Sequence, residues 1–241
     1  IYKIISTINL CEQLAEQNSG YNFVPVFWMA SEDHDFEEIN HIYLYNKKLQ
    51  WNTEQSGVVG KMNLNNIEEF LLKIKHSLKD CADEKLFSIF EESYLKHNNI
   101  SDATRYLLNE LFGKYGLVIL DPNCKELKQQ FIQQIKNDIS YNAYYECLKK
   151  STKDLSKNYK PQANIRKVNF FEISKNSRKH ITDTVDIKKI ENTPEIFSPN
   201  VLMRPMFQEI ILPNISYIGG GGEIAYWLQL RSVFDLEKVP F

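Results

Sequence analysis

The sequence has little that would tie it to a membrane, to nucleic acid or to an oxidising compartment. Its apolar runs, such as 24–30, are much shorter than the roughly 20 residues that a spanning helix requires. Lys and Arg number 29 against 31 Asp and Glu, so no excess of positive charge predicts a nucleic-acid partner. The four cysteines, Cys11, Cys81, Cys124 and Cys147, are widely spaced, which excludes a Cys-x-x-Cys zinc or redox motif. We expect a cytoplasmic protein with reduced thiols.

Glycine is also scarce, and the usual glycine motifs are missing. Four of the nine glycines form the single run 219–222, and it does not spell Gly-x-x-x-x-Gly-Lys-Ser/Thr or a clean Gly-x-Gly-x-x-Gly. No Gly-x-Ser-x-Gly elbow is present either, so serine hydrolysis is disfavoured. Hydrophobic residues make up 43% of the 241 residues, enough for a packed interior.

The segment 24–41 carries the strongest functional signal. Residues 24–30 are uniformly apolar, as in a strand covered on both faces of a parallel sheet. Glu32, Asp33, His34 and Asp35 then follow, at the carboxyl end of the strand, where open α/β sheets bind ligands. Histidine exchanges protons near neutral pH, so His34 is a candidate for proton transfer. The alternative is a surface helix, capped by Ser31, with a solvated acidic face.

A metal site is a second reading of the same segment. If residues 31–41 were helical, then His34, Glu37, Glu38 and His41 would share one face. A metal-dependent hydrolase could use His34, Glu38 and His41 as ligands. The spacing is not His-Glu-x-x-His, however, and we assign no metal site from the sequence.

The rest of the chain alternates between apolar strand patterns and helical ones. Residues 117–120 predict a second buried strand, which ends in Asp121. The run 219–222 would separate a strand from a helix, an arrangement in which backbone N–H groups can approach an anion. Helices are predicted over 1–17, most of 64–114, 125–160 and 223–230, strands over 42–45, 49–51, 165–173 and 214–218, and an exposed hairpin over 179–190.

Two long motifs resemble the bacillithiol biosynthesis cysteine-adding enzyme family, BshC. The first is PVFWMASEDHDFEEINH at 25–41. The second is SPNVLMRPMFQEIILP at 198–213, continuing through YIGGGGEIAYW at 217–227, and weaker matches lie at 112–122 and 162–171. The resemblance covers nearly the whole chain.

The resemblance implies an α/β fold, a Rossmann-like parallel sheet core with helical and mixed α+β insertions. We expect core at 1–60, a helical insertion at 61–110, a core strand at 111–125, a second insertion with a helix and β-hairpin at 126–194, and the last part of the core at 195–241. Family members are about twice as long, with an N-terminal segment before this region and a coiled coil after it. We therefore expect an internal fragment of a longer enzyme that forms a homodimer through the coiled coil.

The resemblance also implies a ligase that adds L-cysteine to glucosaminyl malate by amide formation, the last step of bacillithiol biosynthesis. Adenylation by ATP with Mg²⁺ would suit the fold, although no complete nucleotide fingerprint is present. His34, supported by Asp33 or Asp35, is the expected catalytic group, and Arg204 could grip the malyl carboxylates unless it pairs with Glu209. A non-catalytic ligand-binding relative is the remaining alternative. The expected substrate or nucleotide ligands are Glu32, Asn40, Arg204, Gly219, Gly220, Gly221, Gly222, Glu223, Tyr226 and Trp227.

Overall fold

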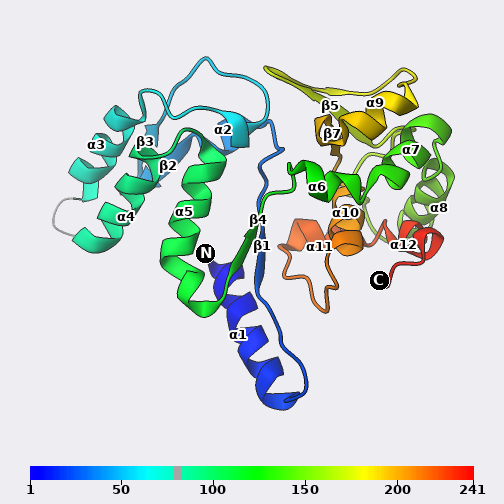
Figure 1. Cartoon of the computed structure of the whole chain (residues 1–241), viewed down its shortest axis with the longest axis horizontal. Helices are drawn as coiled ribbons and strands as arrows, with labels where there is room; N and C mark the ends of the chain where they lie inside the picture. Colours follow the sequence, from blue (N-terminus) through cyan, green and yellow to red (C-terminus); the bar gives the residue numbers. More distant parts are fainter. Residues whose placement is uncertain (79–82) are drawn as a thin grey trace. The chain divides into compact units, whose positions relative to one another are not determined.

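The structure, a computed structural model, describes residues 1–78 and 83–241 as two compact units (Figure 1). The first unit comprises residues 1–122 with 175–177, and the second comprises 123–174 with 178–241. Cys11, Cys124 and Cys147 are free thiols, and Cys81 lies outside the described residues. The expected division into core and insertion segments stays a prediction.

A two-stranded parallel sheet lies in the first unit, as the sequence predicts. Strand β1 (Val26–Trp28) pairs with β4 (Val118–Leu120) over three residues each. Helix α1 (Tyr2–Gln17) contributes Ile4 and Ile8 to a cluster with residues next to β4. The α/β class and the parallel pairing are confirmed, but both strands are shorter than their apolar runs.

A second cluster of the first unit surrounds Trp51, which is 6% exposed. Strands β2 (His41–Leu44) and β3 (Lys47–Gln50) form an antiparallel hairpin. Tyr45 and Asn46 take φ of 48° and 64° at its turn, the left-handed conformation typical of tight hairpins. Three helices complete this layer (Figure 1): α3 (Ile67–Leu78), α4 (Glu84–Leu95) and α5 (Ile100–Phe112).

The second unit begins with three helices, where the sequence predicts one over 125–160. They are α6 (Lys125–Gln129), α7 (Ile132–Tyr141) and α8 (Tyr145–Leu155). Asn142 adopts φ 50° and ends α7, because asparagine tolerates the left-handed conformation that closes a helix. The prediction of a single helix is therefore wrong.

A three-stranded sheet, ordered β6–β5–β7, follows these helices. Its strands are β5 (Phe170–Ser174), β6 (Ser177–His180) and β7 (Phe197–Pro199), with β7 antiparallel to β5. The predicted strand 165–173 forms only from residue 170. The hairpin lies at 170–180 rather than 179–190, because Asp186 caps helix α9 (Ile187–Asn192) within the predicted hairpin.

The last part of the second unit consists of α10 (Arg204–Ile211), α11 (Gly221–Trp227) and α12 (Arg231–Glu237). The predicted strand 214–218 is wrong: this segment is irregular. Its Tyr217 hydroxyl instead hydrogen-bonds with Arg204 and Glu223. The core of this unit contains the fully buried Phe131, Phe170 and Phe207.

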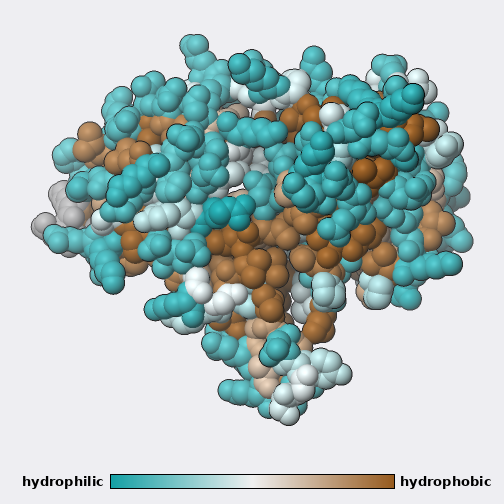
Figure 2. Space-filling model, in the orientation of Figure 1, coloured by the Kyte–Doolittle hydropathy of each residue, from teal (hydrophilic) through white to brown (hydrophobic). Residues whose placement is uncertain are grey.

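Hydrophilic residues cover most of the visible surface of each unit (Figure 2). Exposed hydrophobic side chains also occur, among them Tyr2 and Val118 in the first unit. Within the described ranges 1–78 and 83–241, no helix is both long and apolar enough to cross a membrane.

Candidate functional site

The acidic segment after β1 is a loop and not a helix. Helix α2 (Phe36–Ile39) has only four residues, and Asp35 is the residue at its N-cap. His34 precedes the helix and His41 begins β2. The predicted helical face, on which the hydrolase alternative depended, is therefore wrong, as is the capping role of Ser31. In the described part of the chain, no group of three or more His, Cys, Asp or Glu side chains is arranged to hold a metal ion.

Ser31 instead joins the ends of the two parallel strands. Its hydroxyl donates to Asp121 Oδ1 over 2.5 Å. Trp28 and Leu120 are register partners at the last paired position, so β1 and β4 both end at the same edge of the sheet. Ser31 and Asp121 each follow a predicted buried strand, and a parallel pairing of these strands brings the two residues to one edge of the sheet. That signal could have revealed the contact, which the sequence analysis missed.

The loop is also fixed by a close backbone approach. Gly60 donates its N–H to Ser31 O over 3.0 Å. A Cβ at Gly60 would lie 2.4 Å from Ser101 Oγ and 2.6 Å from Ser31 Cβ, too close for any other residue without movement. Val59 N–H also donates to Asp33 O over 2.7 Å. Residues 59–60 thus hold the loop at two points.

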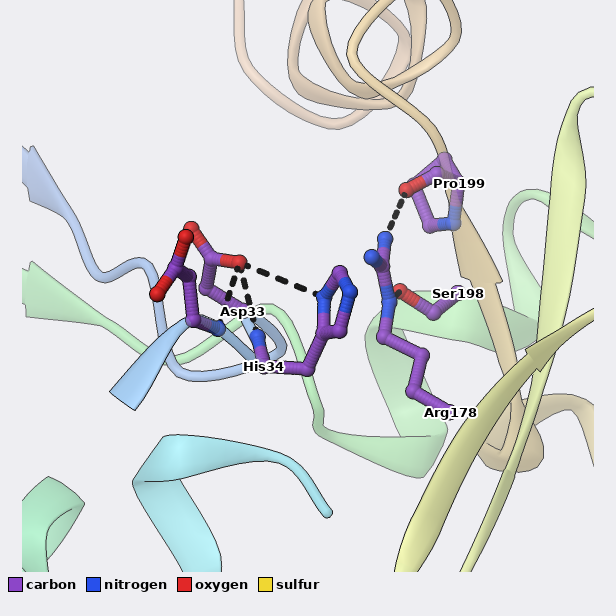
Figure 3. Close-up of polar contacts among 6 residues, drawn as sticks. Asp33, His34, Arg178, Ser198 and Pro199 are labelled. Atoms are coloured by element: carbon purple, nitrogen blue, oxygen red, sulfur yellow. Dashed lines mark hydrogen bonds and ion pairs between the residues drawn. The ribbon is translucent and has the colours of Figure 1, made fainter. Parts of the chain in front are cut away.

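His34 and Asp33 lie side by side on this loop (Figure 3). His34 Nδ1 is 3.5 Å from Asp33 Oδ1, and the two side chains are 53% and 50% exposed. The same carboxylate oxygen accepts the backbone N–H groups of His34 at 2.7 Å and Asp35 at 3.4 Å. Asp33 therefore orders the turn and faces the ring, while the imidazole remains accessible to a reactant.

Glu32 and Asn40, also predicted ligands, are largely buried. Glu32 is 8% exposed and Asn40 is 6% exposed. Asn40 Oδ1 lies 3.0 Å from His41 Nδ1, and Asn40 O accepts the N–H of Trp51 over 2.7 Å. The bonds of Asn40 connect α2 to the β2–β3 hairpin. The ligand role of both residues stays a prediction.

In the second unit, the structure brings Arg204 into direct contact with Tyr226 and links it to Glu223 through Tyr217. The guanidinium donates to the hydroxyls of Tyr217 at 3.0 Å and Tyr226 at 3.2 Å, and to Gln208 Oε1 at 3.2 Å. Tyr217 in turn donates to Glu223 Oε1 over 2.9 Å. Sequence analysis missed Tyr217, although it lies between two predicted ligands, Arg204 and the glycine run.

The charge of Arg204 is held by neutral partners. The hydrogen-bond partners of its guanidinium are hydroxyl and amide groups, and Glu209 accepts from Asn214 Nδ2 at 2.8 Å while the charge of Arg204 acts to lower its pKa. Burial opposes the charge of Arg204, but Tyr217 and Tyr226 outweigh it and raise the pKa of the guanidinium. Burial also raises the pKa of the Tyr217 phenol, which Arg204 partly offsets. The site therefore contains a permanent cation beside the protonated phenol of Tyr217.

The glycine run, predicted to cradle an anion, lies against a carboxylate of its own chain. Gly220, the N-cap residue of α11, donates its N–H to Glu223 Oε2 over 2.6 Å, so a carboxylate of the chain lies at this end of the helix. A Cβ would meet nothing within 4 Å at Gly221 or Gly222. Gly219 is crowded, since its Cβ would lie 2.9 Å from Tyr217 Cε1. The run does not fit a nucleotide phosphate in this conformation.

Trp227 completes this group. Its ring stacks on that of Tyr217, with centroids 4.7 Å apart and planes at 16°. Its indole N–H is buried and meets no hydrogen-bond acceptor in the described part of the chain. A buried donor without an acceptor is costly, and a ligand oxygen could satisfy it.

Comparison with known proteins identifies the family. The family model described as "Bacillithiol biosynthesis BshC, N-terminal Rossmann-like domain" matches residues 1–241. The chain belongs to the BshC family. The Rossmann-like class inferred from the sequence is thereby confirmed.

Relatives in several bacteria carry the same name. Proteins named "Putative cysteine ligase BshC" are 46% identical in Flavobacterium psychrophilum and 45% identical in Flavobacterium johnsoniae, each over 100% of this chain. The BshC relative from Bacillus anthracis is 29% identical over 97% of this chain. The chain spans about half the length of these relatives, at 48%, 49% and 49%.

Proposed function

We propose that this BshC chain is part of a ligase that joins L-cysteine to the amino group of glucosaminyl malate. The names of its relatives support a ligase acting with cysteine, and the family description supports bacillithiol biosynthesis. The observation that carries the proposal is the position of His34, half-exposed beside Asp33, on a loop fixed at the carboxyl edge of β1 and β4. This edge is where open α/β sheets bind their substrates.

Amide formation gives His34 a defined role. The amino group of glucosaminyl malate must lose a proton as its nitrogen attacks the carboxyl carbon of cysteine. The imidazole of His34 would take that proton, and the Asp33 carboxylate would stabilise the resulting imidazolium ion. A carboxylate oxygen of cysteine must leave in an activated form, because a free carboxylate does not react with an amine at a useful rate.

Arg204 suits the binding of a carboxylate. Its guanidinium is ionised, and it donates hydrogen bonds to the hydroxyls of Tyr217 and Tyr226 and to the amide oxygen of Gln208. A malyl carboxylate would accept charge-assisted hydrogen bonds from this cation, which the described residues bind only through hydroxyl and amide groups. The buried indole N–H of Trp227, which stacks on Tyr217, would be a further donor.

ATP remains the proposed source of carboxylate activation, but the glycine run does not provide its phosphate site in this conformation. Glu223 binds the N–H of Gly220, and its negative charge would repel a phosphate. We therefore assign residues 219–222 to no catalytic step.

The test is product formation by the full-length enzyme that contains this domain. Glucosaminyl malate and L-cysteine are incubated with and without ATP and Mg²⁺, and bacillithiol is detected by mass spectrometry. Bacillithiol formed only with ATP supports the ligase with nucleotide activation. Glucosaminyl malate that binds in calorimetry but is never converted would contradict the ligase and favour a non-catalytic binding protein.

A further inference from the structure

Three buried polar side chains form a continuous chain of hydrogen bonds in the second unit. Asp138, on α7, accepts from both the backbone N–H and the side-chain amide of Asn169, the latter at 2.8 Å. Asn169 Oδ1 accepts from Asn200 Nδ2 at 2.9 Å. Asp138 and Asn169 are 0% exposed and Asn200 is 8% exposed. These hydrogen bonds connect Asn169, just before β5, and Asn200, just after β7, to Asp138 on α7.

Asn200 uses its remaining groups to shape the turn that leads to Arg204. Its Oδ1 accepts the N–H groups of Leu202 at 2.9 Å and Met203 at 3.1 Å. Its backbone carbonyl accepts the N–H of Arg204 at 2.9 Å. Arg204 is the first residue of α10, so the geometry of this turn determines where its side chain begins.

The strand before this turn is fixed as well. Arg178, on β6, donates to Ser198 Oγ at 3.1 Å and to Pro199 O at 2.9 Å (Figure 3). Its guanidinium lies 4.0 Å from the ring centroid of Phe171 on the central strand. The end of β7 is therefore held from one side, and Asn200 follows it directly.

Packing alone would not require this arrangement. Burying a carboxylate is expensive, and a well-packed apolar group of similar size is often as stable. Directional hydrogen bonds, in contrast, define one geometry. We propose that Asn200 is a positioning residue for Arg204, and that Asp138 and Asn169 lock Asn200 in place so that the guanidinium is presented to a substrate carboxylate. The proposal rests on the carboxylate-binding role of Arg204 in the proposed function.

The test exchanges the two buried side chains in the full-length enzyme. Asp138→Asn alone places an amide NH₂ against a donor of Asn169, and Asn169→Asp alone places two carboxylates together. The double variant, Asp138→Asn with Asn169→Asp, restores every hydrogen bond, because the new amide at 138 donates to the new carboxylate at 169. Asn158→Asp, at an exposed position, is the matched control.

The expected result is a selective loss of substrate binding. Each single variant raises the KM for glucosaminyl malate about tenfold or more, since one buried polar contact is broken. The KM for L-cysteine and kcat stay within about twofold, and the double variant returns towards wild type. A single variant with wild-type KM for glucosaminyl malate, or a double variant as impaired as the singles, overturns the proposal.

Two further measurements keep the result interpretable. If the single variants do not fold, Asn200→Ser is used, because serine can still accept hydrogen bonds from the turn but cannot reach Asn169. The same rise in the KM for glucosaminyl malate is expected. An unchanged KM overturns the proposal. The NMR signal of Arg204 Nε–Hε is recorded in all variants. If the wild-type enzyme forms no product, the proposed function fails, and the positioning role is judged by this signal alone. A signal that shifts in the single variants and returns in the double variant supports it, and an unchanged signal overturns it.

Discussion

Ser31 and Asp121 are 90 positions apart in the sequence and share a hydrogen bond of 2.5 Å. The bond closes the carboxyl edge of the parallel pair β1 and β4, at the base of the loop that carries Asp33 and His34. The candidate catalytic loop is thus joined to the sheet through a side chain from the other strand.

Removing the Ser31 hydroxyl should loosen this loop. Ser31 is 5% exposed, so Ser31→Ala leaves an oxygen of Asp121 without its buried donor and should lower the free energy of unfolding by about 1–3 kcal/mol. Chemical denaturation measures the change. Ser156→Ala, which removes an exposed hydroxyl bonded within its own helix end, is the control. Equal stability of the two variants would show that the Ser31–Asp121 bond contributes nothing.

The close approach at Gly60 gives a second prediction. Gly60→Ala places a methyl group 2.6 Å from Ser31 Cβ, and relief of this overlap should cost about 1–3 kcal/mol and displace the loop. Gly20→Ala is the matched control, since its Cβ meets nothing within 4 Å and the change should stay within about 0.5 kcal/mol. Thermal unfolding of the pair checks this. A Gly60→Ala protein as stable as the control would disprove the contact.

Binding of glucosaminyl malate should depend on the shape of the Arg204 side chain as well as on its charge. Its guanidinium reaches Tyr217, Tyr226 and Gln208 at once, which the single ammonium group of lysine cannot do. Arg204→Lys should therefore raise the KM for glucosaminyl malate about tenfold. Steady-state kinetics of the full-length enzyme measure it, with Arg231→Lys at an exposed position as the control. An unchanged KM for glucosaminyl malate in both variants would show that Arg204 does not bind this substrate.

Asp138 predicts a pH dependence of stability. Burial raises the pKa of this carboxyl to about 6, although its two bonds from Asn169 act in the opposite direction. The unfolded value is about 3.9, so the folded state binds the proton more tightly between these values. The contribution of protonated Asp138 to the free energy of unfolding is therefore greatest below about pH 4 and is lost as the pH rises through about 6.

Denaturation of the wild type and of Asp138→Asn between pH 4 and 7.5 tests this sign. The free energy of unfolding of the wild type should rise by up to about 3 kcal/mol relative to that of the variant as the pH falls through this range. A difference that is constant with pH, or that changes in the other direction, would contradict the raised pKa.

The sequence predicted those features that depend on local patterns of hydrophobicity. The apolar run before Ser31 and the run before Asp121 gave the parallel pair, and their polar ends gave the candidate loop. The errors arose where individual hydrogen bonds or backbone conformations, which the hydrophobic pattern does not reveal, decide the structure. Residues 214–218 look like a strand, but they are irregular, and Tyr217 binds Arg204 and Glu223. The helix predicted over 125–160 breaks twice, and at the second break the left-handed conformation of Asn142 ends α7.

The central claim, that His34 transfers the proton in amide formation, is tested most directly by the rate of bacillithiol formation in His34→Ala. A positioned general base contributes about 10²–10⁴-fold, so the variant of the full-length enzyme should lose at least about 100-fold in kcat, with partial recovery on addition of imidazole. His76→Ala, an exposed histidine on α3, should keep the wild-type rate. A His34→Ala enzyme that forms bacillithiol as fast as His76→Ala would contradict the account.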